Sequence, residues 1–211
     1  MRRLLLFLLL TLALTACGGA PTPPAADVQQ LITDGQAAYD RGDMPTAIQY
    51  LEQARQSDAQ NPILLATLGR AYLRNNQTDL AITTLQEAAA RDPQNVDVLF
   101  DLGTLYYQEG RVEEAIQTFE RAGAAAPNDA DILYNLGSAY AQTGNFDKGI
   151  ELYNRALEIN PRLALAYFGL GTLYIQKGET AAAREALNQF ITLSDDPDLR
   201  TRAQQMLADL Q

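Results

Sequence analysis

The sequence predicts an all-α protein, built as a solenoid of about five helix pairs with a capping helix at the C-terminal end. The first observation behind this prediction is a glycine that recurs at a spacing of 34 residues, and the second is a turn residue with the same period. The third is that apolar residues within each unit follow the three-and-four spacing of one helical face. A fixed period of this length is typical of stacked helical repeats. The glycine series is Gly35, Gly69, Gly103, Gly137 and Gly171.

Each 34-residue unit contains two helical stretches. In the third unit, the apolar stripe of residues 96–108 is followed after Gly110-Arg111 by a second stripe that starts at Val112 and includes Ala115 and Phe119. A short connection between two amphipathic stretches predicts a pair of antiparallel helices. The periodic glycine of the first helix and Ala115 of the second are small, as expected where two helices pack at about 8–10 Å.

Turn residues separate the two helices of each pair and close the second helix. Left-handed backbone at a helix end favours glycine, and asparagine tolerates it, so a periodic Gly/Asn series predicts these turns. The series is Gly42, Asn76, Gly110, Gly144 and Gly178. Pro93, Pro127 and Pro161 follow the second helices of repeats two to four, and proline cannot continue a helix.

These residues resemble the tetratricopeptide repeat (TPR), in which Leu-Gly-x-x-Tyr is followed by alanine and a closing proline. The resemblance implies a right-handed superhelix of five repeats and covers about four-fifths of the chain. Repeats two to four match best. The first repeat departs at Asp34 and Ala38, the fourth has Gly149 in place of alanine, and the fifth lacks the proline. The repeats span 28–61, 62–95, 96–129, 130–163 and 164–197.

A capping helix is predicted over residues 198–211. Asp196-Pro197 is typical of an N-cap followed by proline at the first helical position. The apolar residues that follow fall on one stripe, which would cover the open end of the fifth repeat, as solenoids require for solubility. This stripe comprises Leu199, Ala203, Met206, Leu207 and Leu210.

The N-terminus resembles a bacterial lipoprotein signal. Residues 1–16 carry Arg2-Arg3 and then an apolar run that is too short to span a membrane, which indicates a secretory signal peptide. Leu-Thr-Ala before Cys17 resembles a lipobox, so Cys17 is expected to carry acyl chains as the new N-terminus. Residues 17–27 are rich in Pro and Gly and predict a tether. The alternative is an ordinary signal peptide with a chance cysteine.

The resemblance implies a location in the cell envelope. In a bacterium with two membranes, we expect the chain to be lipid-anchored to the outer membrane and to face the periplasm. In a species with one membrane, we expect it on the outer face of the plasma membrane. Two or more acyl chains hold a protein stably on a bilayer, because each buried methylene contributes about 0.8 kcal/mol.

Composition argues against catalysis and against nucleic acid as a partner. The chain has no histidine, no tryptophan and one cysteine, which removes histidine and thiol chemistry and most zinc sites. We therefore expect a protein that is not an enzyme and has no cofactor or metal. The net charge is −10, and loss of Arg2 and Arg3 with the signal peptide would leave 14 basic and 26 acidic residues. Such a surface repels phosphate backbones.

The family resemblance implies that the first helix of each repeat lines a concave groove for a protein or peptide partner. Carried onto this sequence, the groove positions place aromatic residues among charged and amide side chains, which suits peptide binding. The predicted groove set is Arg70, Arg74, Asp97, Phe100, Asp101, Tyr107, Asp131, Tyr134, Asn135 and Phe168. Hydroxyl and amide neighbours are Thr104, Gln108, Ser138, Gln142, Thr172 and Gln176.

The groove residues also permit a purely structural interpretation. Arg70 and Arg74 lie one helical turn apart, so their mutual repulsion mildly favours an acidic partner group. Alternatively, these arginines pair with Asp40 and Asp101 across neighbouring repeats. In that interpretation the aromatic residues of the groove pack between first helices.

The sequence therefore predicts a membrane-anchored TPR lipoprotein that acts as a non-catalytic interaction adaptor in the bacterial envelope. The alternatives are a structural or self-associating lipoprotein that uses its convex face, or a pilotin or assembly factor for a secretion or pilus system. The sequence does not fix the oligomeric state.

Overall fold

The computed structural model describes residues 27–210, and all regular structure within this range is α-helical. The predictions for the signal peptide, Cys17 and most of the tether fall outside the described residues. Each of the five repeats contributes one pair of helices, and a final helix follows. The helices are α1 Val28–Asp40, α2 Met44–Ser57, α3 Pro62–Arg74, α4 Thr78–Arg91, α5 Val96–Gln108, α6 Val112–Ala125, α7 Ala130–Gln142, α8 Phe146–Ile159, α9 Ala164–Lys177, α10 Thr180–Leu193 and α11 Pro197–Asp209.

The turn between the two helices of each repeat has the backbone that the sequence predicts. Gly42, Gly110, Gly144 and Gly178 have φ between 74° and 81°, and Asn76, the remaining member of the series, has a positive φ of 59°. The second helices of repeats two to four end two residues before their prolines, because proline lacks the amide hydrogen that would continue the helix.

The glycine of the first helix provides the close contact within each pair. A Cβ on Gly103 would lie 2.7 Å from the ring of Phe119, and a Cβ on Gly69 would lie 2.7 Å from Cγ of Leu85. Because no side chain larger than hydrogen fits there, the two helices of a repeat can approach closely. The glycine period seen in the sequence therefore arises from packing.

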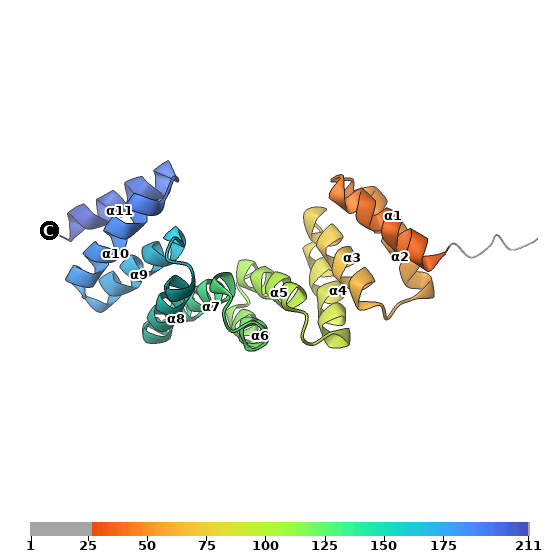
Figure 1. Cartoon of the computed structure of the whole chain (residues 1–211), viewed down its shortest axis with the longest axis horizontal. Coiled ribbons are helices and arrows are strands. Elements are labelled where there is room, and N and C mark those ends of the chain that lie inside the picture. Colours follow the sequence, from red (N-terminus) through yellow and green to blue (C-terminus); the bar gives the residue numbers. More distant parts are fainter. Residues whose placement is uncertain (1–26, 211) are drawn as a thin grey trace, which may run out of the picture.

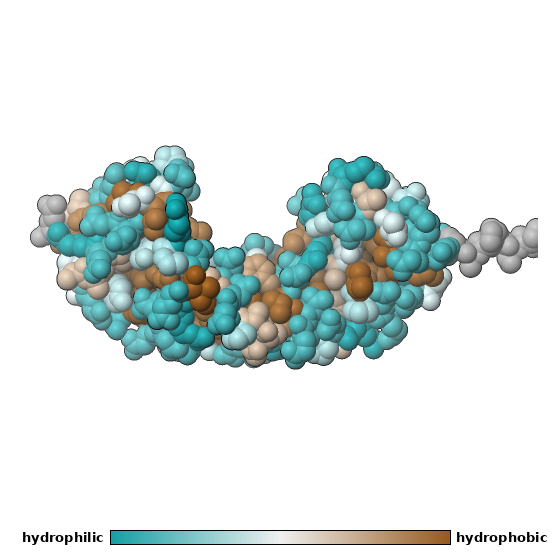
Figure 2. Space-filling model, in the orientation of Figure 1, coloured by the Kyte–Doolittle hydropathy of each residue, from teal (hydrophilic) through white to brown (hydrophobic). Residues whose placement is uncertain are grey.

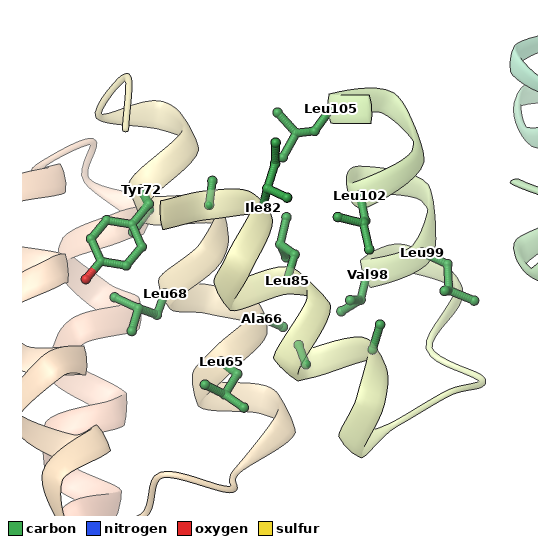
Figure 3. Packing of buried hydrophobic residues seen from close by; sticks show 14 of the residues in the cluster. Leu65, Ala66, Leu68, Tyr72, Ile82, Leu85, Val98, Leu99, Leu102 and Leu105 are labelled. Atoms are coloured by element: carbon green, nitrogen blue, oxygen red, sulfur yellow. The ribbon is translucent and has the colours of Figure 1, made fainter. Parts of the chain in front are cut away.

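The core continues from repeat to repeat. Between α3, α4 and α5, Ile82 and Leu85 face Val98 and Leu102, and all four side chains are buried (Figure 3). At the C-terminal end, Ala203 of α11 packs with the last helix pair in the way that a capping helix should. This core is a stack of similar layers, so each repeat is stabilised mainly by its neighbours.

The stack curves into an open arc. Figure 1 shows α1 and α11 at its two ends, with α5 and α7 lining the inner side at its middle and α6 and α8 on the outer side. The space-filling view shows a broad hollow between the two ends, with apolar surface exposed near its floor (Figure 2). At the middle of the arc, the first helices α5 and α7 therefore provide the concave surface.

Candidate protein-binding surface

The ten groove residues predicted from the sequence all lie on first helices, and none of them is buried. The structure divides most of them between two hollows. Five line the first hollow: Arg70, Asp97, Phe100, Asp101 and Asp131. Three line the second: Tyr107, Tyr134 and Phe168. Arg74 and Asn135 line neither hollow.

The first hollow, which we call the acidic hollow, has a volume of about 450 Å³ between α3, α5 and α7. Its basic side chain is engaged, because Nε of Arg70 donates to a carboxylate oxygen of Asp101 at 2.5 Å. Asp129 caps α7 by accepting hydrogen bonds from the backbone amides of Asp131 and Ile132. Asp97 and Asp131 remain exposed at the rim. The hollow therefore presents mainly negative charge.

Arg74 is engaged as well. Its guanidinium lies 4.7 Å from the ring centroid of Tyr39, and Nη1 donates to the carbonyl of Tyr39 at 3.3 Å. The alternative interpretation from the sequence is thus right for Arg70 with Asp101, but Arg74 contacts Tyr39 instead of Asp40. Because Asp101 pairs with Arg70, the repulsion between the two arginines that favoured an acidic partner group is largely offset.

The second hollow, which we call the aromatic hollow, has a volume of about 430 Å³ between α5, α7, α8 and α9. Its lining residues are aromatic, aliphatic, hydroxyl or amide in character, and none carries a formal charge. Tyr107, Tyr134 and Phe168 come from three successive first helices, whereas Phe146 and Tyr153 come from α8. Leu165, at the start of α9, is 43% exposed.

Aromatic residues of the groove pack on rings from the second helix of their own repeats. Ring centroids are 6.1 Å apart for Phe100 and Phe119, and 5.6 Å for Tyr134 and Tyr153. Phe168 packs in the same way on Phe190 at 5.0 Å. Because the first ring of each pair stays partly exposed, it contributes to both the core and the concave surface. Such rings lose little freedom when a partner covers them.

Tyr153 occupies a slot that two glycines leave open. A Cβ on Gly169 would lie 2.6 Å from its ring, and a Cβ on Gly137 would lie 3.0 Å away. Oη of Tyr153 lies 3.0 Å from Oγ of Ser138, which also donates to the carbonyl of Tyr134. The slot thus fixes a phenol at the floor of the aromatic hollow.

Burial controls the ionisation of these tyrosines. It raises the pKa of Tyr153 to about 12, with a smaller opposing effect from the Ser138 hydroxyl. Burial also raises the pKa of Tyr107 and of Tyr134 above the ordinary value. All three phenols are therefore neutral near pH 7, and the aromatic hollow stays uncharged.

Several lining residues were missed by sequence reasoning. Leu165 occupies a groove position by the same register that gave Asp97 and Asp131, so it could have been found. Tyr153 replaces Leu or Phe at its position in the other repeats, and Gly169 replaces larger polar residues. These two departures are the only sequence signal for the slot. The other missed residues are Tyr39, Val96, Asp129, Ile132, Ala141, Phe146 and Leu173.

Comparison with known proteins identifies the repeats and the fold. Three family models described as tetratricopeptide repeat match residues 38–92, 66–130 and 128–195. Together these matches extend from the first repeat into the fifth. The chain belongs to the tetratricopeptide repeat proteins, and its fold is an all-α TPR superhelix.

Solved structures share the fold. The crystal structure of MamA protein is 25% identical, with a TM-score of 0.71, and covers 86% of this chain and 94% of its own. A MamA structure from Desulfovibrio magneticus RS-1 is 23% identical, with a TM-score of 0.74, and the match covers 80% of this chain and 97% of the MamA chain. YrrB, described as a TPR protein with an unusual peptide-binding site, is 21% identical, with a TM-score of 0.77. The match covers 85% of this chain and 92% of YrrB. A search of curated proteins found no match.

Within residues 27–210 the chain offers a surface for binding, but no cluster of metal-ligating side chains and no membrane-spanning helix. No group of three or more potential metal-ligating side chains lies together within residues 27–210. Over the same range, every helix is too short or too polar to span a bilayer. TPR proteins bind protein or peptide partners and are generally non-catalytic, and the concave surface of this chain suits that class of interaction.

Proposed function

We propose that this protein is a lipid-anchored TPR adaptor of the bacterial cell envelope, which holds a segment of a partner protein in its concave groove. The observation that carries the proposal is the aromatic hollow. It combines rings from four helices with hydroxyl and amide groups, and two of these helices, α5 and α7, line the inner side of the arc (Figure 1). Aromatic side chains with adaptable polar neighbours are typical of protein-binding surfaces.

The chemistry of the two hollows supports a partner segment that inserts an apolar or aromatic side chain. The aromatic hollow is neutral, so it would bury such a side chain without leaving a charge unpaired. The neighbouring acidic hollow disfavours an acidic residue in the same segment, because Asp97 and Asp131 are exposed and Arg70 is already paired. A peptide-binding site in YrrB, which shares the fold, fits the same class of function.

The anchor in this proposal is Cys17. Its lipobox-like context supports acylation, and the Pro- and Gly-rich residues 17–27 would connect the lipid to α1. Because residues 28–209 then stand off the membrane, the concave groove is free to take a partner in the envelope. The strongly acidic composition supports the same arrangement, since it gives anionic lipid no electrostatic hold on the repeats.

Photo-crosslinking in cells tests the groove. A benzophenone amino acid at Tyr107 replaces one aromatic residue of the hollow by another. We expect it to capture one specific protein in the envelope. The substitution Leu165→Glu places a charge at the mouth of the aromatic hollow, and it should reduce the yield about tenfold, since an apolar side chain would be left beside an unpaired carboxylate.

The matched control is Ile63→Glu. Ile63 occupies the same repeat position in α3 as Leu165 in α9 and is 70% exposed, but it lines neither hollow. The control should leave the crosslink unchanged. Capture of no protein from Tyr107, or equal loss of yield in both variants, would refute groove binding.

A further inference from the structure

A hydrogen bond recurs between the second helix of one repeat and the first helix of the next. The Tyr72 hydroxyl donates to Glu52, and the Tyr140 hydroxyl donates to Glu120, each at 2.5 Å. In the intervening junction, Nε2 of Gln86 donates to the Tyr106 hydroxyl at 2.5 Å. Each pair is separated by 20 residues, so these bonds are part of the repeat pattern.

The junction between the fourth and fifth repeats departs from this pattern. Tyr174 has the tyrosine position, but the residue 20 positions earlier is Asn154, whose side chain is one methylene shorter than Gln or Glu. Within residues 27–210, the Tyr174 hydroxyl makes none of the side-chain hydrogen bonds that its counterparts make. The last junction is therefore not closed by the recurring bond.

Two further truncations widen the same junction. Ala182 and Ala186 of α10 stand where the third repeat has Glu114 and Thr118. The hollow between α8, α9 and α10 measures about 690 Å³, compared with about 480 Å³ for the equivalent hollow between α4, α5 and α6. Figure 1 shows that α8, α9 and α10 lie next to one another near the C-terminal end. We call this larger space the junction hollow.

The lining of the junction hollow combines apolar surface with negative charge. Leu157, Leu170, Tyr167 and Tyr174 supply apolar surface, and the side chains of Glu158 and Glu185 supply two carboxylates. The lining residues include no lysine or arginine, and neither carboxylate takes part in a salt bridge within the described chain. Glu158 and Glu185 are both exposed.

We infer that the junction hollow is a second docking site, which binds a protein segment whose aliphatic or aromatic side chain is flanked by lysine or arginine. The apolar side chain would fill the space that the truncated residues leave, and the flanking cations would meet the two carboxylates. Charge complementarity selects this occupant over an acidic segment.

This site is separate from the concave groove. Helix α9 contributes Tyr167, Leu170 and Tyr174 to the junction hollow, but it contributes Leu165, Phe168 and Thr172 to the aromatic hollow. The two sets lie on different sides of one helix, so one partner or two could be held at the same time. The inference does not depend on the function proposed for the groove.

Photoaffinity labelling of the full purified chain in detergent tests the site. The probe is a blocked pentapeptide, glycine-lysine-benzoylphenylalanine-lysine-glycine, and the comparison peptide carries glutamate in place of both lysines. Mass spectrometry should place label from the lysine peptide on residues of α8, α9 or α10 that line the junction hollow. The glutamate peptide should give at least about tenfold less label there.

Two variants make the result specific. Asn154→Gln with Ala182→Leu restores the partner for Tyr174 and refills the hollow, using residues that equivalent positions of repeat two already carry. It should lower labelling of the junction hollow about tenfold, because the apolar side chain of the probe is excluded. Leu165→Glu, in the aromatic hollow, should leave that labelling unchanged.

Three outcomes would overturn the inference. They are label confined to other regions of the chain, equal labelling by the two peptides, and labelling of the junction hollow that survives its closure. Failure of the groove proposal would appear separately, in the Tyr107 crosslinking experiment, as capture of no protein or as equal loss of yield in the Leu165→Glu and Ile63→Glu variants.

Discussion

Removal of the Phe119 side chain should destabilise the solenoid at its centre. Phe119 is fully buried, and its ring lies directly against Gly103 and packs with Phe100. Phe119→Ala would leave a cavity in the third repeat that Gly103 has no side chain to fill. Truncations of this kind cost about 3–5 kcal/mol, made up of lost transfer free energy and the cavity itself.

Urea unfolding followed by circular dichroism measures this effect, and the repeats provide the matched control. Leu51, Leu85 and Leu187 occupy the position equivalent to Phe119 and are fully buried. Phe119→Leu should therefore cost less than about 2 kcal/mol, as a conservative core change does. A loss below about 1 kcal/mol for Phe119→Ala, or equal losses for both variants, would refute the packing of Phe119 under Gly103.

Three other perturbations have defined outcomes. Asn76→Ala should lower the free energy of unfolding by about 1 kcal/mol, since alanine resists the left-handed backbone at φ 59°, and thermal melting would show this. Burial raises the pKa of Tyr153 to about 12, so stability should persist below pH 10 and fall as the pH rises toward 12. In Tyr153→Phe, the loss of stability between pH 10 and 12 should be smaller. It should not disappear, because Tyr72 and Tyr140 also have pKa values of about 12. Cys17→Ser should move the protein from the membrane fraction to the soluble fraction, and unchanged partition would contradict lipid anchoring.

The repeat architecture could be predicted from the sequence because it needs particular residue types at fixed positions, and few other residues can take their place. Gly103 must be small for two helices to meet, and Asn76 stands in a series of glycines because the turn has a left-handed backbone. Both features recur every 34 residues, so the signal is repeated five times in one chain.

The site could be predicted only in part. The family register placed Phe100, Tyr134 and Phe168 on the concave surface, where the structure has them partly exposed. The sequence offered the pair of Arg70 and Asp101 only as one of two interpretations, and it did not indicate that Arg74 stacks on Tyr39, because those contacts depend on the spacing and rotation of neighbouring repeats. The arginines therefore pointed toward an acidic partner that the structure does not favour.

The junction hollow lies beyond what a single repeat can indicate. Asn154, Ala182 and Ala186 are unremarkable one at a time, and their effect arises only where two adjacent repeats meet. Cys17 remains a prediction from the sequence, since it lies outside the described residues.

Mapping of the partner segment on the chain tests the central claim most directly. The segment captured from Tyr107 would be added to the isotopically labelled chain, and the shifts of backbone amide and aromatic side-chain resonances would be recorded. Groove binding is expected to move the signals of Tyr107, Tyr134 and Phe168 most. Shifts confined to the backbone amides of α6, on the outer side of the arc (Figure 1), would contradict it and favour a lipoprotein that works through its convex face.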